Sequence, residues 1–209
     1  MKEISFKSLR RFNLTMGLLH FVQGTLMLIF ALTFDKIKAF KLPVFSNFLT
    51  FDTKLMTLVT DNSKIFDVPF GAFVSIFLFL SALFHFLIVM PKLNDTYNKN
   101  IENGINPFRW YEYAVSSSVM IVLIALLFGI YDIGLLIAMF VLNASMNLFG
   151  LLMEKINQYT EKTNWLSFIY GSIAGLATWV IIFMFAFGNS DLDQVPWFVY
   201  AIFGSYFVF

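Results

Sequence analysis

Apolar stretches long enough to cross a membrane recur along this chain and restrict the folds open to it. A helix needs about 20 apolar residues to span the hydrocarbon core of a bilayer. The composition fits such a chain, because only 13% of its residues are charged, against about 25% in soluble domains. We therefore expect one transmembrane domain covering residues 1–209, an all-α polytopic membrane helix bundle. Five complete spans are predicted, at residues 13–34, 68–90, 110–130, 133–153 and 166–187.

A further apolar segment follows Pro196 and covers residues 197–209. At about 1.5 Å per residue it extends roughly 20 Å, which is shorter than the hydrocarbon core of about 30 Å. Backbone groups left without partners in lipid are costly. We therefore interpret this segment as the first part of a sixth helix, and we expect the printed sequence to be a piece of a longer polypeptide.

Basic residues predict which side of the membrane the N-terminus occupies, since cytoplasmic loops are enriched in lysine and arginine. The N-terminal segment and the loops at 91–109 and 154–165 hold nine of the 14 basic residues, and the 35–67 loop holds the other five. This difference predicts a cytoplasmic N-terminus. The first apolar run is too long for the core of a signal peptide and lacks a small-residue cleavage site, so we expect a retained helix.

The 35–67 loop is too long for a simple connection. Its stretch VFSNFLTFDTKLMTLVT places β-branched and aromatic residues in rough alternation around Asp52, which is typical of a short hairpin. Two alternatives stay open for this segment: a hairpin lying on the outer surface of the protein, and an irregular loop.

Three ionisable side chains lie inside the predicted spans: His20, His85 and Glu112. Such groups are costly in lipid, usually face the interior of the bundle and mark functional sites. Ser116 follows Glu112 by one helical turn, so it could bond Glu112 directly or through water, at the charged end of an otherwise apolar pocket. The alternatives are a helix-entry carboxylate paired with Arg109 for Glu112, and a neutral ring bonded to a backbone carbonyl for each histidine.

Other predicted helices carry polar or small faces at helical spacing. The fourth span has a face that should look inward or at a partner, formed by Asn143, Asn147, Gly150 and Glu154. The fifth span has a GxxxG pattern, which predicts close helix packing either within the bundle or in a dimer. Its small face comprises Gly171, Ala174, Gly175 and Thr178. In the first span an inward face is predicted for Gly17, His20, Gln23 and Gly24.

Several classes of function are disfavoured by the sequence. The chain has no cysteine, which excludes disulfides, thiolate metal sites and cysteine nucleophiles. It also lacks the HExxH, P-loop and GxSxG motifs. A net charge of +1 gives no sign of nucleic-acid binding. We therefore expect neither an enzyme, nor a metal site, nor a nucleic-acid partner.

Several stretches resemble the heliorhodopsins, relatives of the microbial rhodopsins with inverted membrane orientation. The longest is FRWYEYAVSSSVMIVLIA at 108–125, which is highly specific. The others are LSALFHF (80–86), NASM (143–146), FGLLMEK (149–155), GSIAG (171–175) and VPWFVY (195–200). They run from the second to the sixth span. The expected cytoplasmic N-terminus is similar to the orientation of that family.

The resemblance implies a rhodopsin-like seven-helix bundle in which all-trans retinal is bound through a protonated Schiff base to a lysine of the seventh helix. It implies that Glu112 is the counterion and that His20 and His85 line a polar cavity, with Gln23 beside them. The retinal pocket would include Ser116, Ser117, Met120, Asn143 and Met146. The sequence departs from the family in one respect, because every lysine precedes Leu166. The Schiff-base lysine is absent from the printed sequence, so we expect it to end before the seventh helix.

The function that the resemblance implies is that of a light sensor and not of a pump, because a proton relay needs more carboxylates than Glu112 supplies. A light-gated proton or cation channel is one alternative, and a nonphotoactive structural or partner-regulating membrane protein is another. The expected partners are the lipid bilayer and an unidentified signalling partner. We also expect a homodimer, formed through the fourth and fifth helices and the 35–67 loop.

Overall fold

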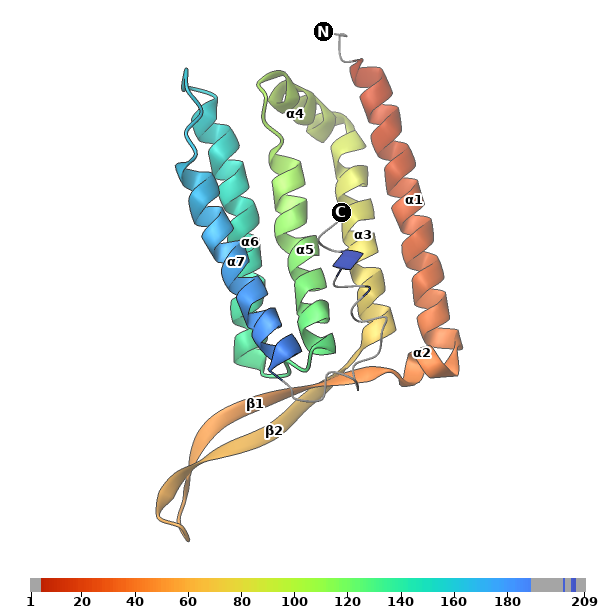
Figure 1. The fold of residues 1–209 in the computed structure, drawn as a ribbon. Coiled ribbons are helices and arrows are strands. Elements are labelled where there is room, and N and C mark those ends of the chain that lie inside the picture. Colours follow the sequence, from red (N-terminus) through yellow and green to blue (C-terminus); the bar gives the residue numbers. More distant parts are fainter. Residues whose placement is uncertain (1–4, 189–200, 202–203, 206–209) are drawn as a thin grey trace.

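Five long helices form the main body of the protein in the computed structural model, which describes residues 5–188, 201 and 204–205 (Figure 1). They are α1 (Phe6–Thr33), α3 (Phe70–Val89), α5 (Pro107–Leu127), α6 (Ile133–Asn157) and α7 (Leu166–Phe187). Each of them is long and apolar enough to cross a membrane, and each packs on the next in this order. The predicted membrane helix bundle is confirmed. The predicted sixth segment, 197–209, lies outside the described residues except at 201 and 204–205.

Two of the helices begin earlier than predicted, at residues where a side chain caps the backbone. α1 begins at Phe6 because the Ser5 hydroxyl accepts a hydrogen bond from the Ser8 N–H at 3.4 Å. At the start of α5, the Asn106 side chain accepts a hydrogen bond from the Arg109 N–H at 3.3 Å. Such caps satisfy backbone donors that the first helical turn leaves without partners.

The 91–109 segment, predicted as a loop, contains a helix, α4 (Pro91–Glu102). Pro91 lies in its first turn, where the missing N–H is tolerated. Asn94 and Tyr97 are its buried side chains, and Asn94 Nδ2 donates to the Ile88 carbonyl at 2.8 Å. The loop prediction missed this element because a short, mainly polar helix lacks the long apolar run by which the spans were found. α4 lies at the same end of the bundle as the N-terminus (Figure 1).

The 35–67 segment forms a short helix followed by a hairpin, with elements α2 (Asp35–Ala39), β1 (Lys41–Asp52) and β2 (Thr57–Pro69). The two strands are antiparallel, with a bulge between Val44 and Phe45. At the turn, Asp52 Oδ1 accepts hydrogen bonds from the N–H groups of Lys54 at 2.7 Å and Leu55 at 3.1 Å, a local pattern that aspartate favours. Of the two alternatives for this segment, the structure therefore has the hairpin. Its distal half projects away from the helices (Figure 1).

Hydrogen bonds tether the base of the hairpin to the turn between α5 and α6. The Phe45 N–H donates to the Tyr131 carbonyl at 2.9 Å. The Asn47 side-chain amide donates to Asp132 Oδ2 at 2.9 Å, and Asp132 Oδ1 accepts from the Leu135 N–H at 2.8 Å. One carboxylate therefore holds the hairpin and also caps the start of α6.

The buried core lies at the hairpin end of the bundle. Side chains of the strands and helices meet there, including the fully buried Val44, Ile121, Leu126, Met139 and Ile182. Apolar contacts between the hairpin and the helices therefore fix the strands against the bundle.

The GxxxG face of α7 packs on α6 within the same chain. A Cβ added at Gly171 would lie 3.0 Å from the Phe149 Cβ, and one added at Gly175 would collide with the Met146 sulfur. The small residues thus allow the close approach of two helices that the pattern predicted. Of the two alternatives, packing within the bundle is the one that the structure contains.

Candidate functional site

A large cavity lies between α3, α5 and α6, with a volume of about 920 Å³. This volume is within the range of about 300–1,000 Å³ typical of small-molecule sites. Its polar lining residues are Ser81, Glu112, Tyr113, Ser116, Ser117, Asn147 and Ser205. Its apolar lining residues are Met27, Phe70, Val74, Phe77, Met120, Leu123, Ile124, Leu127 and Met146. Along α5 the polar lining comes first and the apolar lining follows, so the cavity is polar toward the N-terminal end of the bundle and apolar toward the hairpin.

Glu112 lies on the wall of this cavity, in the first half of α5. Its Oε1 accepts a hydrogen bond of 2.5 Å from the hydroxyl of Ser81 on α3. The sequence had predicted a contact with Ser116, which lines the cavity one turn further along α5. The structure has no direct bond between these two side chains, because the serine of the neighbouring helix reaches the carboxylate instead. A contact between Glu112 and Ser116 through water stays a prediction.

The helix-entry alternative for Glu112 required an ion pair with Arg109, and the structure contradicts it. Arg109 Nη2 lies 2.6 Å from Oε1 of Glu154, near the end of α6. Oε2 of the same glutamate accepts a hydrogen bond from the Asn106 N–H at 2.8 Å. Arg109 is therefore engaged with α6, and Glu112 stays on the cavity wall without this arginine as its partner.

The two histidines lie side by side between α1 and α3. The ring centroids of His20 and His85 are 5.7 Å apart, with an angle of 18° between the ring planes. His85 Nδ1 lies 3.2 Å from Oδ1 of Asn13. Among the described residues neither ring bonds to a backbone carbonyl, so the alternative given for each histidine was wrong. Two buried nitrogens, Nδ1 of His20 and Nδ2 of Asn13, have no hydrogen-bond partner among the described residues.

A second, smaller cavity of about 170 Å³ adjoins the carboxylate on its N-terminal side. Its polar lining residues are Asn13, His85, Tyr97, Asn106, Arg109, Glu112 and Tyr113. Glu112 and Tyr113 line both cavities. Buried polar groups that lack protein partners are ordinarily satisfied by water, and this cavity has the polar lining that water requires. Glu112 therefore stands between a polar space and a mainly apolar one.

A chain of hydrogen bonds joins α5 to α6 behind the cavity wall. Asn143 Nδ2 donates to the hydroxyls of Ser117 at 2.8 Å and Ser118 at 3.1 Å. Asn147 Nδ2 donates to Ser117 at 3.1 Å and to the Asn143 carbonyl at 2.9 Å, while the Ser117 hydroxyl donates to the Tyr113 carbonyl at 2.5 Å. A serine hydroxyl has one donor and two acceptor positions. Ser117 uses all three within the protein, so it holds α5 and α6 together at the cavity wall.

The face of α6 that carries Asn143 and Asn147 contacts α5 along most of the length of α6. Beyond Asn147, the indole ring of Trp110 occupies the space where a Cβ at Gly150 would lie, and Glu154 pairs with Arg109. The predicted polar face of the fourth span therefore looks inward, toward α5.

The structure places most of the predicted pocket residues around one space. Ser116, Ser117, Met120 and Met146 line the 920 Å³ cavity. Asn143 is buried behind Ser117 and bonds to it.

Gln23 departs from the prediction, because its side chain is exposed on the surface of α1. Neighbouring residues on a helix lie about 100° apart. Gly24 faces Phe79 of α3, so the residue before it points elsewhere.

The residues of the site that were missed in the sequence include Ser81, Asn147 and Asn13. Each of them lies four residues, about one helical turn, from a residue that had been predicted to face inward. Ser81 precedes His85 by four residues and shares its face, and Asn13 precedes Gly17 by four residues on the face that holds His20. Asn147 had been placed on the inward face of its helix but not in the pocket.

Helices long enough to span a membrane, around a large, mainly apolar cavity with a carboxylate on its wall, define a membrane protein with an internal space for a small molecule. The family model for heliorhodopsins matches residues 9–209. The chain belongs to the heliorhodopsin family, as the stretches in its sequence indicated. It is thus an integral, multi-pass membrane rhodopsin and not a member of a typical enzyme family. A comparison with curated proteins found no match.

Proposed function

We propose that this protein is a retinal-binding, light-sensing membrane photoreceptor of the heliorhodopsin type, with Glu112 as the counterion of the chromophore. The observation that carries the proposal is the position of Glu112. It is the carboxylate on the wall of a 920 Å³ cavity whose remaining lining is mainly apolar. A buried negative charge is costly in a membrane unless an opposite charge accompanies it, and a protonated Schiff base would supply that charge.

The residues around the cavity fit all-trans retinal, the cofactor that the family implies. Met120 and Met146 line its apolar part, where soft, flexible side chains adapt to the shape of a polyene. Glu112 and Ser116 line its polar part. Bound retinal would supply visible absorption and isomerisation on illumination. The residues described around the cavity include no lysine, and attachment to a lysine of a seventh helix remains what the family implies.

The residues of this chain would act on the charge of the bound group. Glu112 would stabilise the positive charge, since an ion in low dielectric needs an opposite charge and hydrogen bonds. Ser81 would orient the carboxylate through its hydrogen bond. The His20–His85 pair and the small cavity beside Glu112 would offer water and ring nitrogens to a proton released toward the N-terminal end.

Sensing is favoured over pumping by the number of proton carriers. A pump requires a relay of acceptor and donor groups, and beside Glu112 the spans predicted from the sequence supply only His20 and His85. Glu154, near the end of α6, is paired with Arg109. A light-gated proton or cation conductance is the second candidate. It is favoured by one observation, namely that Glu112 lines both the polar and the apolar cavity and would border a wet path between them.

The proposed assembly is a homodimer through α6, α7 and the hairpin, in a membrane whose cytoplasmic side carries the N-terminus. Both helices present apolar side chains outward, and the hairpin exposes Phe48 and Leu49 by 70% and 67%. The orientation rests on the excess of lysine and arginine at the α4 end of the bundle. The signalling partner would be contacted at one of the two ends.

The test uses the protein expressed from its gene to the natural stop codon and reconstituted in lipid with all-trans retinal. We expect a visible absorption band that changes reversibly on illumination, and no photocurrent under voltage clamp. A photocurrent would favour the conductance. A preparation that stays colourless would refute the photoreceptor and favour the nonphotoactive alternative.

A further inference from the structure

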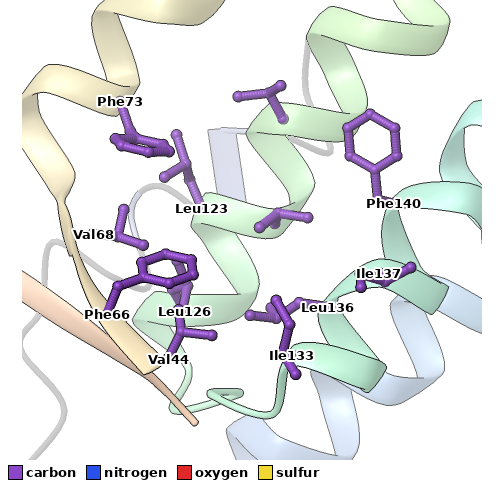
Figure 2. A pocket seen from close by; sticks show the side chains of 12 residues that line it. Val44, Phe66, Val68, Phe73, Leu123, Leu126, Ile133, Leu136, Ile137 and Phe140 are labelled. Carbon is purple, nitrogen blue, oxygen red and sulfur yellow. The ribbon is translucent and has the colours of Figure 1, made fainter. Parts of the chain in front are cut away.

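The first two turns of α1 carry three positive charges, in contrast to an apolar space at the other end of the bundle. Beside the hairpin, a space of about 260 Å³ is lined only by valine, leucine, isoleucine and phenylalanine, and Figure 2 shows these side chains, among them Phe73 and Phe140. That space offers no charge by which to select a ligand. At the start of α1, by contrast, the side chains of Lys7, Arg10 and Arg11 are exposed.

Arg10 holds the start of α1 against the end of α3. Its Nε and Nη2 donate to the Val89 carbonyl at 3.1 and 2.8 Å. This carbonyl is one of those that the last turn of a helix leaves without an intrahelical partner. The acceptor is neutral, so the two bonds orient the guanidinium and leave its positive charge uncompensated at the corner between α1 and α3.

The other cations at this corner also lack a counter-charge among the described residues. Lys7, Arg11 and Lys92, an exposed residue at the start of α4, belong to neither ion pair of that part of the chain. Asp95 lies one turn further along α4 and offsets one charge at most. Together with Arg10, the corner therefore carries a surplus of positive charge that an anion would balance.

The length of α1 places these charges at the depth of the lipid headgroups. Its 28 residues extend about 42 Å at about 1.5 Å per residue. The hydrocarbon core is about 30 Å thick, and the whole bilayer with its headgroups is about 40–45 Å thick. The acidic and basic residues of α1 all lie in its first two turns, so this is the end of the helix that extends beyond the core.

An apolar surface continues from two of these cations into the hydrocarbon. Leu14 follows Lys7 by seven residues, and Leu18 follows Arg11 by seven. Seven residues make about two helical turns, so each leucine lies below a cation on the same face of α1. The two leucines are 45% and 52% exposed. We call this face, formed by Lys7, Arg11, Leu14 and Leu18, the α1 stripe.

The α1 stripe faces away from the interior of the bundle. Leu18 and Met27 are nine residues apart, which places them on opposite sides of the helix at about 100° per residue, and Met27 lines the large cavity. α1 packs mainly on α3, and α6 and α7 lie at the far side of the bundle (Figure 1). The stripe is therefore separate from the cavity and from the proposed dimer contact.

We propose that the α1 stripe, with Arg10 beside it, binds one anionic phospholipid of the leaflet on the α4 side. The phosphate lies against Lys7 and Arg11, and one acyl chain lies along Leu14 and Leu18. A free phosphate would leave the leucines uncovered, and a soluble acidic protein would have to enter the headgroup layer, whereas an anionic lipid matches both the charges and the apolar surface below them. The site requires no retinal.

The test measures lipid binding to the delipidated full chain in detergent by native mass spectrometry. Dioleoyl phosphatidylglycerol is compared with dioleoyl phosphatidylcholine, which has the same tails and no net charge. We expect the first phosphatidylglycerol to bind about 25-fold more tightly, about fivefold for each of Lys7 and Arg11. The preference should shrink as ionic strength rises from about 0.1 M to about 1 M, because the Debye length falls from about 10 Å to about 3 Å. Equal affinities, or a preference that ionic strength does not change, would overturn the proposal.

Single substitutions separate the α1 stripe from the general positive charge of this end. Lys7→Gln and Arg11→Gln should each weaken the binding of phosphatidylglycerol about fivefold and leave that of phosphatidylcholine unchanged. Lys99→Gln is the matched control, since it removes one exposed positive charge about 10 Å beyond Lys92 along α4, and it should leave both affinities unchanged. Arg11→Lys keeps the charge and should keep the preference, with folding judged by circular dichroism.

Two further outcomes would contradict the α1 stripe as a lipid site. Equal weakening by Lys99→Gln and Arg11→Gln would show that the charge of the whole surface attracts the lipid and that no site exists on α1. Competition by inorganic phosphate at the concentration of the lipid would identify a site for the free anion. The comparison at two ionic strengths needs no variant, so the proposal stays open to refutation if a glutamine variant does not fold.

Discussion

The hydroxyl of Ser81 on α3 donates a hydrogen bond of 2.5 Å to Oε1 of Glu112 on α5. The bond joins two membrane-spanning helices at the wall of the large cavity. Hydrogen bonds to an ionised acceptor are shorter and stronger than those between neutral groups. The position of the carboxylate is therefore set by a residue of another helix, 31 positions away in the sequence.

The charge of Glu112 should control the colour of the retinal-bound protein. We expect Glu112→Gln to shift the visible band to longer wavelength, because a counterion stabilises the cationic ground state and the glutamine removes that negative charge. Absorption spectra of the purified variants measure the shift. Glu154→Gln is the matched control, since Glu154 pairs with Arg109 outside the cavity. An unshifted band in Glu112→Gln would contradict the counterion assignment.

Removing the Ser81 hydroxyl should destabilise the protein and move the band less than Glu112→Gln does. Ser81→Ala leaves a part-buried carboxylate oxygen without its donor, at a cost near the lower end of about 1–3 kcal/mol. Ser75→Ala is the control on the same helix, because within the described part of the chain Ser75 bonds only to the Ala72 carbonyl of its own helix. Unfolding in mixed micelles of denaturing detergent measures both. Equal losses of stability would show that the bond between helices contributes no more than the bond within α3.

Ser117 and Ser116 should differ in what they contribute to the free energy of unfolding. Ser117→Ala removes the acceptor shared by Asn143 and Asn147, and hydrogen bonds between membrane helices contribute about 0.6 kcal/mol each. We therefore expect a loss of about 1 kcal/mol in the free energy of unfolding. Ser116→Ala should leave stability unchanged, since Ser116 has no hydrogen-bond partner among the described residues. The opposite order of the two variants would mean that Ser117 is not the centre of the network.

A methyl group at Gly175 should change the shape of the large cavity. The Cβ of Gly175→Ala would collide with the sulfur of Met146, and Met146 lines the cavity. We expect the side chain to move into the cavity and to slow the binding of retinal, measured by the growth of the visible band. Gly175→Ala combined with Met146→Ala should restore the rate. Slow binding in the double variant would point to a displaced helix and against a displaced side chain.

Two substitutions at Asp132 should separate its roles. Asp132→Asn keeps an N-cap side chain for α6, since asparagine caps as well as aspartate, and weakens the charged bond to Asn47. Asp132→Ala loses the cap as well, at a cost of about 1 kcal/mol. We expect faster hydrogen exchange in the hairpin for both variants and faster exchange at the start of α6 for the alanine variant alone. Unchanged exchange in the hairpin would show that Asp132 does not hold it.

Much of the fold was predictable because hydropathy and length act within a single segment. The five spans followed from the thickness of the bilayer, and alternation around Asp52 indicated the hairpin as one of two alternatives. Glu112, His20 and His85 were found because ionisable groups at membrane depth are rare. These features depend only on neighbours in the sequence, so a single sequence is enough to detect them.

The partners of these residues were not predictable, because they come from other helices. Arg109 pairs with Glu154 and Ser81 bonds to Glu112, and both contacts depend on how far the helices rotate about their axes. Gln23 was placed inward by its closeness to Gly24, although neighbouring positions on a helix diverge by about 100°. Helix rotation is set by packing across the whole bundle, which no local pattern contains.

The bond between the Phe45 N–H and the Tyr131 carbonyl gives the protruding strands a mechanical role. From this anchor, β1 runs on to Asp52, a distance of about 23 Å at about 3.3 Å per residue. The strand pair is thus a lever arm whose pivot is the turn between α5 and α6. A sideways force on its tip acts as a torque on that turn, and α6 carries the torque toward the asparagines behind the cavity wall.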